Sequence, residues 1–155
     1  MGTLETILTE HPFLKGIAPP HIEFIAGCAS NVRFNKGDYI FREEEEADRF
    51  YLIRHGLVAL DMFVPQRGPV TIDTIQEGEV LGWSWLFPPY RWHFDARALQ
   101  LTRAVAFDGK CLREKCSQET VLGYELLKRF SLVMMQRLQA ARLQLLDLYG
   151  DTTRK

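Results

Sequence analysis

The spacing of apolar residues changes once along this chain, and that change restricts the fold more than any other feature. Between residues 32 and 107 the apolar residues come in short runs separated by turns, and the run VTIDTIQ at 70–76 alternates between apolar and polar residues over its first four positions. After residue 118 they recur every three or four positions, at Leu127, Phe130, Met134, Leu138, Ala141, Leu145 and Leu148. The first pattern predicts an antiparallel sandwich or barrel, and the second predicts one long helix from 118 to about 149.

The short runs give the expected elements and their boundaries. We expect strands at 32–34, 39–41, 49–54, 57–64, 70–76, 92–100 and 102–107. The segments LETIL at 4–8 and HIEFIAGCA at 21–29, the second after a Pro-Pro pair, predict short helices. The sequence therefore predicts one domain over 1–155, with N-terminal helices in 1–30, a β-barrel in 31–108 and C-terminal helices in 109–150.

The composition is that of an ordinary globular domain. Apolar residues make up 46% of the 155 positions and charged residues 25%, with a formal net charge of −1. A near-neutral chain lacks the basic excess that nucleic-acid binding usually requires. No apolar run approaches the roughly 20 residues of a membrane span, and the N-terminus lacks the blocks of a secretion signal. We therefore expect no membrane association.

The three cysteines, Cys28, Cys111 and Cys116, predict a reducing compartment. The last two stand in CLREKC, which has neither the spacing of a redox motif nor that of a zinc site, and no fourth Cys or nearby His completes a ligand set. We expect buried or half-buried free thiols and a cytoplasmic protein.

The long helix has more apolar surface than one packing face requires. Leu126, Val133, Leu143 and Leu146 widen the stripe that the three-four spacing defines. One face can cover the barrel, and the remainder predicts a homodimer through the helix at 118–149. The alternative is a single broad face that is covered entirely within the monomer.

The segment GEVLGWSWLFPPYRWHFDARAL at 78–99 holds all three tryptophans, together with two arginines and a histidine. Aromatic rings bring apolar area, while the indole, guanidinium and imidazole groups provide directional hydrogen bonds. This composition indicates a pocket for an organic ligand rather than a metal site.

Four motifs then follow one another in order: KGDYIF at 36–41, ADRFYLIRHG at 47–56, GEVLG at 78–82 and ARAL at 96–99. This order, over nearly the whole chain, resembles the cyclic nucleotide-binding domain family. The resemblance implies a mainly β fold, an eight-stranded antiparallel jelly-roll barrel with short N-terminal helices and a long C-terminal helix. It also implies that residues 82–97 form the phosphate-binding cassette, which in this family interrupts the barrel between its sixth and seventh strands.

The chain departs from the family at the two positions that recognise the ligand. The resemblance places Trp83 where the family has a Glu that holds the ribose, and Trp92 where it has the Arg that pairs with the cyclic phosphate. A third departure is Glu44, in a turn where the family usually has Gly. Two lost charge-assisted bonds, at about 1.5–3 kcal/mol each, predict that cyclic AMP and cyclic GMP are not bound in the usual way.

The candidate ligand-binding residues are all in or beside the cassette. Backbone amides of a helix beginning after Gly82 and the Ser84 hydroxyl suit an anionic group, and the tryptophans form either an aromatic box or a plug that fills the barrel. The predicted site consists of Gly82, Trp83, Ser84, Trp85, Arg91, Trp92 and His93. No cofactor is required, and the expected ligand is a small anionic or nucleotide-like compound.

The pattern does not indicate an enzyme. The four histidines are scattered, and no H-x-H, G-x-S-x-G, H-E-x-x-H or P-loop motif occurs. We expect a stand-alone sensor domain with a remodelled pocket that signals to an effector protein in trans through its C-terminal helix. No helix-turn-helix follows that helix, so we expect no DNA binding by this chain alone. Two alternatives remain: an interaction module with a filled barrel and no ligand, and a weak cyclic nucleotide binder.

Overall fold

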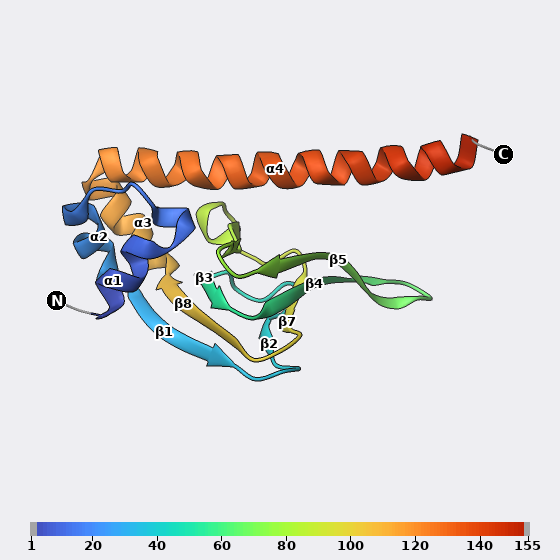
Figure 1. Ribbon diagram of the computed structural model, residues 1–155, viewed down its shortest axis with the longest axis horizontal. Coiled ribbons are helices and arrows are strands. Elements are labelled where there is room, and N and C mark those ends of the chain that lie inside the picture. The colour runs from blue at the N-terminus through green and yellow to red at the C-terminus, as the bar shows by residue number, and fades with distance from the viewer. Residues whose placement is uncertain (1–2, 154–155) are drawn as a thin grey trace.

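The computed structural model describes residues 3–153, with helices at both ends and strands between them (Figure 1). The N-terminal helices are α1 (Thr3–Glu10), the short 3-10 helix η1 (Pro12–Leu14) and α2 (Pro19–Ala26). The strands are β1 (Ala29–Phe34), β2 (Tyr39–Phe41), β3 (Arg49–His55), β4 (Leu57–Val64), β5 (Gly68–Gln76), β6 (Val80–Leu81), β7 (Asp95–Ala98) and β8 (Thr102–Asp108). The 3-10 helix η2 (Ser84–Leu86) lies between β6 and β7, and α3 (Gly109–Gln118) and α4 (Thr120–Thr153) follow β8.

Within residues 3–153 the eight strands form two four-stranded sheets, in the orders β1-β8-β3-β6 and β2-β7-β4-β5. Every strand pair is antiparallel. This confirms the mainly β jelly-roll prediction with its flanking helices. The sheets do not close into a continuous barrel, however, so the predicted barrel is an open jelly roll of two facing sheets.

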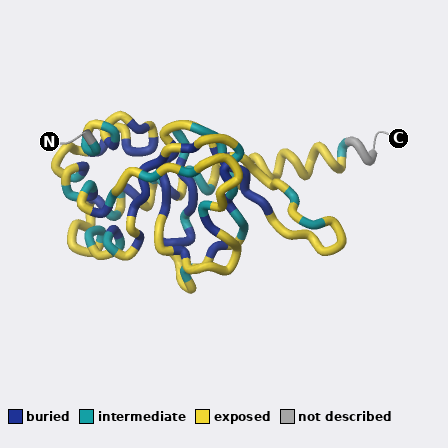
Figure 2. Tube along the Cα trace, turned by 90° about the horizontal axis from the view of Figure 1, so that it is seen from below, coloured by how far each residue is buried: buried dark blue, intermediate teal, exposed yellow. Residues whose placement is uncertain are grey.

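The sheet β1-β8-β3-β6 separates two apolar cores. On β3, Phe50 and Leu52 face the helices, while Tyr51 and Ile53 face the opposite sheet. The helix-side core also contains Leu8, Ile25, Val105, Leu112 and Phe130, among others. Because both faces of this sheet are covered, β3 is a continuous apolar run rather than an alternating one. Figure 2 shows the buried positions concentrated in the sheets and in the segments that cover them.

The C-terminal region consists of two helices, of which α4 is the long helix predicted at 118–149. The carboxylate of Asp108 accepts a hydrogen bond from the backbone N–H of Cys111 and caps the start of α3. Glu119 leaves the helical conformation, with φ −118° and ψ 87°, and thereby separates α3 from α4. Helix α4 crosses the body of the molecule and then projects well beyond it (Figure 1). No helix in the described range is long and apolar enough to cross a membrane.

The cysteines correct the sequence prediction of free thiols. Cys28, immediately before β1, and Cys111, in the first turn of α3, form a disulfide between residues 83 positions apart in the sequence. Cys116 is the free cysteine of the described residues, and burial raises the pKa of its thiol. Spacing within CLREKC could not reveal this pairing, because the partner of Cys111 lies on a distant segment that only the fold brings close.

Around the cassette, the structure differs from the strands predicted from the sequence at two more places. The two-residue strand β6 was not predicted, because Val80 and Leu81 alone are too short to show a period. The strand predicted at 92–100 begins only at Asp95. The backbone before it pairs instead with the acidic loop: the Trp92 N–H donates to the Glu45 carbonyl, and the Glu44 N–H donates to the Trp92 carbonyl.

Candidate ligand-binding site

The cassette begins at Gly82, which adopts the left-handed conformation with φ +94°. A Cβ built at this position would lie 2.7 Å from the nearest carbon of the Trp92 indole. Only glycine allows this approach, because any side chain would collide with the ring and strain the backbone. The helix predicted to begin after Gly82 is the three-residue turn η2.

Trp92 fills the interior of the jelly roll at this point. Its side chain is 2% exposed and stacks on Phe41, with ring centroids 3.7 Å apart and planes inclined by 6°. It belongs to the core between the two sheets, together with Tyr51, Ile53 and Leu81. The position at which the family resemblance expects the phosphate-binding arginine is therefore occupied by a packed indole.

Trp85 lies in the other core. It is 1% exposed and packs against Phe50 and Phe130, at centroid distances of 4.9 and 5.5 Å. The Arg113 guanidinium donates to its backbone carbonyl, and its own indole Nε1 is buried without a hydrogen-bond partner. Ser84 beside it is buried as well. Trp85 thus joins the cassette to the helices rather than to the sheet interior.

Trp83 occupies a third environment, at the seam between the cassette and α4. It is half-buried, and the Arg137 guanidinium lies over its ring at 5.8 Å from the centroid. Arg91 and His93 are exposed. Arg91 donates to the Glu44 carbonyl of the acidic loop. The predicted site residues are therefore distributed over two cores, a seam and the surface.

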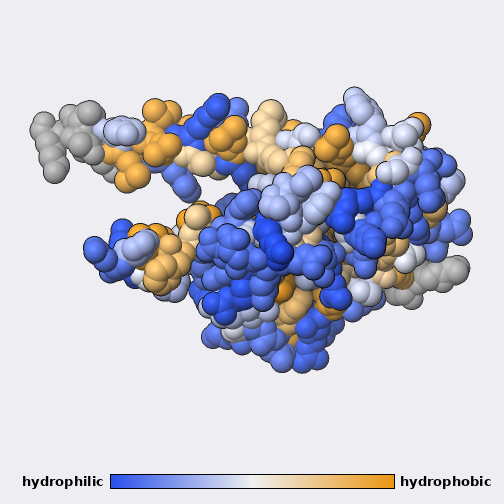
Figure 3. Space-filling view, turned by 180° about the vertical axis from the view of Figure 1, so that it is seen from behind, coloured by the Kyte–Doolittle hydropathy of each residue, from blue (hydrophilic) through white to orange (hydrophobic). Residues whose placement is uncertain are grey.

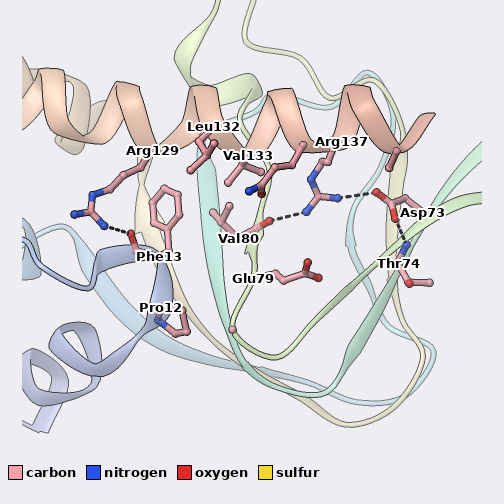
Figure 4. Close-up of a pocket in the computed structure, with 13 residues that line it drawn as sticks. Pro12, Phe13, Asp73, Thr74, Glu79, Val80, Arg129, Leu132, Val133 and Arg137 are labelled. Carbon is pink, nitrogen blue, oxygen red and sulfur yellow. Dashed lines mark hydrogen bonds and ion pairs between the residues drawn. The ribbon is translucent and has the colours of Figure 1, made fainter. Parts of the chain in front are cut away.

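A cavity of about 430 Å³ opens where α4 passes over the jelly roll (Figure 4). Its volume falls within the range of small-molecule sites. Helix α4 forms one wall, η1 a second, and the β5–β6 region a third. The lining residues are Pro12, Phe13, Asp73, Thr74, Gly78, Glu79, Val80, Arg129, Leu132, Val133, Gln136, Arg137 and Ala140.

Two arginines of α4 connect the walls of this cavity. Arg137 donates to the Asp73 carboxylate at 2.7 Å and to the Val80 carbonyl at 3.4 Å (Figure 4). Arg129 donates to the Phe13 carbonyl at 2.8 Å, and Glu125 one turn away accepts from its Nε at 3.0 Å. The Nε atom of Arg137 is buried without a partner. The cavity therefore contains the Arg137 guanidinium, which is largely hydrogen-bonded but has a free Nε donor, and apolar side chains such as Val80 and Leu132.

Sequence reasoning missed this seam. The sequence feature that could have indicated this cavity is the pair Arg129 and Arg137, which are eight positions apart within the apolar pattern of the helix. A spacing of eight places both residues on one face. What that face meets is decided by the path of α4, which the sequence pattern does not give.

Arg97, the arginine of the ARAL motif, forms an ion pair between strands. It donates to the Asp61 carboxylate at 3.1 Å, and the Thr71 hydroxyl donates to the other oxygen of Asp61 at 2.7 Å. Asp61 is 2% exposed, so this pair links β4, β5 and β7 from within the sheet. The neighbouring Asp95 pairs instead with Arg42, at 3.5 Å.

The fold and the cassette together define a sensor-type regulatory domain. The sequence profile of the cyclic nucleotide-binding domain matches residues 31–119. Because this match covers more than half of the chain, the protein belongs to the cyclic nucleotide-binding domain family.

Among its relatives, the CRP-like cAMP-activated global transcriptional regulator of Mycobacterium tuberculosis is 25% identical over 145 residues, which are 94% of this chain. The chain spans 63% of the length of that regulator. A candidate cyclic nucleotide-binding protein from Geobacter metallireducens is 28% identical, with a TM-score of 0.76 over 89% of this chain and 99% of the other. A cyclic nucleotide-binding domain from Methylobacillus flagellatus, 15% identical, has a TM-score of 0.83 over 95% of this chain and 86% of the other.

Proposed function

We propose that this chain is a regulatory sensor domain whose ligand pocket has moved from the cassette to the seam between α4 and the jelly roll. The observation that carries this proposal is the position of Trp92, which packs against Gly82 where a ligand phosphate would otherwise meet the cassette. A cyclic nucleotide could enter in the family's usual pose only if this buried indole left its stack on Phe41. The cavity at the seam needs no such rearrangement.

Ligand occupancy would reach α4 through Arg137. This side chain joins the helix to β5 through Asp73 and to β6 through the Val80 carbonyl, and it covers the ring of Trp83. An anionic group in the cavity would compete with Asp73 for the guanidinium and use the free Nε donor. A ligand can shift α4 only if it binds two arrangements of the helix with different affinities. Such a difference would arise if Arg137 pairs with Asp73 in one arrangement and with the ligand in the other.

The output in this proposal is α4 itself, paired with a second copy of the chain. The predicted three-four stripe reaches the core at Phe130 and continues from there into solvent, where Leu138, Leu145 and Leu148 are 53%, 54% and 66% exposed. Intervals of four, three, four and three residues from Met134 to Leu148 match the seam of a two-stranded coiled coil. Figure 3 shows hydrophobic side chains along the projecting part of α4 and on the nearby β4–β5 hairpin. An effector protein in trans would then recognise the paired helices.

A second candidate function is an interaction module with a filled interior and no ligand. The burial of both Trp85 and Trp92 favours it, because these rings are packed inside the two cores. In that case the seam would be a structural gap, and α4 would present a constant surface to its partner. The third alternative, weak binding of cyclic nucleotides through the cassette amides, remains an outcome of the same experiment.

The test begins with calorimetric titration of cyclic AMP and cyclic GMP into the intact chain, for which we expect no binding in the low micromolar range. A thermal-shift screen of nucleotides, cyclic dinucleotides and aromatic acids then searches for the ligand. A compound at a hundred times its dissociation constant stabilises the folded state by about 2.7 kcal/mol, which is readily detected.

The decisive variant is Arg137→Gln, with Arg142→Gln on the exposed part of α4 as its matched control. We expect any hit to bind the first variant at least about tenfold more weakly and the control unchanged, since one charge-assisted bond is removed. Equal binding to both variants would refute the seam as the site. A screen without hits would favour the interaction module, and micromolar cyclic AMP binding would favour a cassette site. Sedimentation of a Leu138→Glu, Leu145→Glu variant tests the dimer separately.

A further inference from the structure

Three arginines that line neither the cassette nor the seam cavity gather on the outer face of the sheet β1-β8-β3-β6. Arg33 on β1 and Arg103 on β8 are directly opposite each other in the antiparallel register. Arg103 is also paired with His55 on β3, and Arg54 stands at the irregularity beside it. Paired residues share a face, so these basic side chains form a row across three neighbouring strands.

This row lies on the face that the helices cover elsewhere. Arg103 alternates with Val105 and Phe107 of the helix-side core, which places it on the same face but beyond the helical cover. Figure 1 shows the ends of β1 and β8 that carry the row leading away from α1, α2 and α3. Arg33, Arg54 and Arg103 are all exposed. The guanidinium groups are therefore available to a ligand from solvent.

The charge of this row is largely uncompensated. Among residues 3–153, none of the three arginines forms an ion pair with a carboxylate. Arg33 and Arg54 reach only amide oxygens, those of Asn35 at 3.4 Å and Asn31 at 3.5 Å. Like charges directly opposite in a sheet destabilise it, so the apposition of Arg33 and Arg103 is a cost that the surrounding protein does not offset.

A hollow lies within the row. Its volume is about 340 Å³, and Arg54, His55, Leu101 and Arg103 line it. Two carboxylates are nearby: Glu77 lies 4.0 Å from His55, and Glu10 lines an adjoining hollow that Arg54 also borders. They approach the Arg54 side of the row and leave Arg103 and Arg33 unpaired.

From this geometry we infer a second, independent site, which binds the phosphate or a similar multivalent oxyanion of a small ligand. Guanidinium groups are suited to bidentate recognition of such oxyanions. An anion placed between Arg103 and its neighbours removes the like-charge cost on β1 and β8 and so stabilises the sheet. The small hollow, with Leu101 as its apolar contact, favours a compact ligand over an extended acidic segment of another protein. This inference does not depend on the proposed function, since none of its residues lines the seam.

The test measures thermal unfolding of the intact chain with inorganic pyrophosphate, and with NaCl at matched ionic strength. We expect pyrophosphate at about ten times its dissociation constant to raise the midpoint by a few degrees, roughly 2–4 °C, beyond the effect of NaCl. Arg103→Gln should raise the midpoint at low salt without the anion and should lower pyrophosphate affinity at least about tenfold. Arg67→Gln removes the same charge from the exposed β4–β5 hairpin and should behave like the parent chain.

Amide chemical-shift mapping of the parent chain should place the pyrophosphate contacts on β1, β3 and β8, and Arg33→Gln provides a second variant with the same expectation as Arg103→Gln. An equal response of the Arg103→Gln and Arg67→Gln variants would overturn the inference, as would a pyrophosphate effect no larger than that of NaCl. Binding of a glutamate-rich peptide in the absence of pyrophosphate binding would also overturn it and assign the row to an acidic protein partner.

Discussion

The indole of Trp92 lies flat on the ring of Phe41, with centroids 3.7 Å apart. Phe41 belongs to β2 and Trp92 to the segment before β7, so this stack closes the sheet interior over the cassette glycine, Gly82. This contact holds the indole against Gly82 and supports the proposal that the family's usual ligand pose is blocked.

Trp92→Ala should lower the free energy of unfolding by about 3–5 kcal/mol, because a large buried ring is removed and its cavity is only partly filled by relaxation. Chemical denaturation of the parent and variant measures the difference. Phe87→Ala is the control, since Phe87 is 46% exposed and should cost far less. Similar losses in the two variants would show that Trp92 is not a core residue.

Glu44→Gly should stabilise the chain by about 1 kcal/mol. Glu44 has φ +73°, a conformation that disfavours any residue with a Cβ and that glycine adopts freely. Thermal or denaturant unfolding reports the gain. Glu43→Gly, one position earlier and outside this conformation, should be neutral or destabilising, and a gain of equal size there would contradict the explanation.

Stability should fall as the pH drops below about 6.5, the ordinary pKa of histidine. His11 is buried, its Nδ1 accepts from the Phe13 N–H at 3.1 Å and its Nε2 donates to the Ile53 carbonyl at 3.0 Å. Burial lowers the pKa of His11 in the folded state, although the bond to Ile53 opposes this shift. As the pH falls, His11 is therefore protonated in the unfolded chain before it is protonated in the folded chain. The stability that neutral His11 contributes is fully present above pH 6.5 and is lost as the pH falls toward the lower pKa of the folded state.

Unfolding free energies measured between pH 5 and 8 test this. The His11→Gln variant should show a flatter slope than the parent, whereas His93→Gln, which changes an exposed side chain, should keep the parent slope. A parent stability that rises on acidification through this range would be the opposite of the expected sign.

Reduction of the Cys28–Cys111 disulfide should lower the unfolding free energy by about 2–4 kcal/mol, because the bond restricts a long loop of the unfolded chain. The same loss is expected for Cys28→Ser and for Cys111→Ser, and a reductant should have no further effect on either variant. Cys116→Ser should retain the sensitivity to reductant. Thiol titration of the denatured parent chain provides an independent count of free cysteines.

Arg97→Met should destabilise the chain by about 3 kcal/mol, because it leaves the buried carboxylate of Asp61 without its charged partner. Asp61→Asn in the Arg97→Met background should recover part of the loss, since the unpaired charge is then removed. A double-mutant cycle on unfolding free energies measures the coupling. A coupling energy near zero would mean that the Arg97–Asp61 pair does not stabilise the fold.

The sequence by itself determined the class of fold. The strand patterns, glycine turns and the three-four stripe after residue 118 predicted an antiparallel β domain with a long C-terminal helix, because these periodicities depend only on local geometry. The jelly roll itself was implied by the resemblance that the order of the four motifs carries. The motif order also identified the cassette and its two indoles at Trp83 and Trp92. Such features are local in the chain, and a local pattern predicts them.

The tertiary structure alone decided how these parts meet. It placed Trp85 and Trp92 in different cores, joined Cys28 to Cys111, and brought Arg137 against Asp73. It also set Arg33 opposite Arg103. Each of these contacts joins segments far apart in sequence, so it depends on strand register and helix path rather than on residue spacing. The cavity at the α4 seam could not be predicted for the same reason: its walls come from three separate parts of the chain.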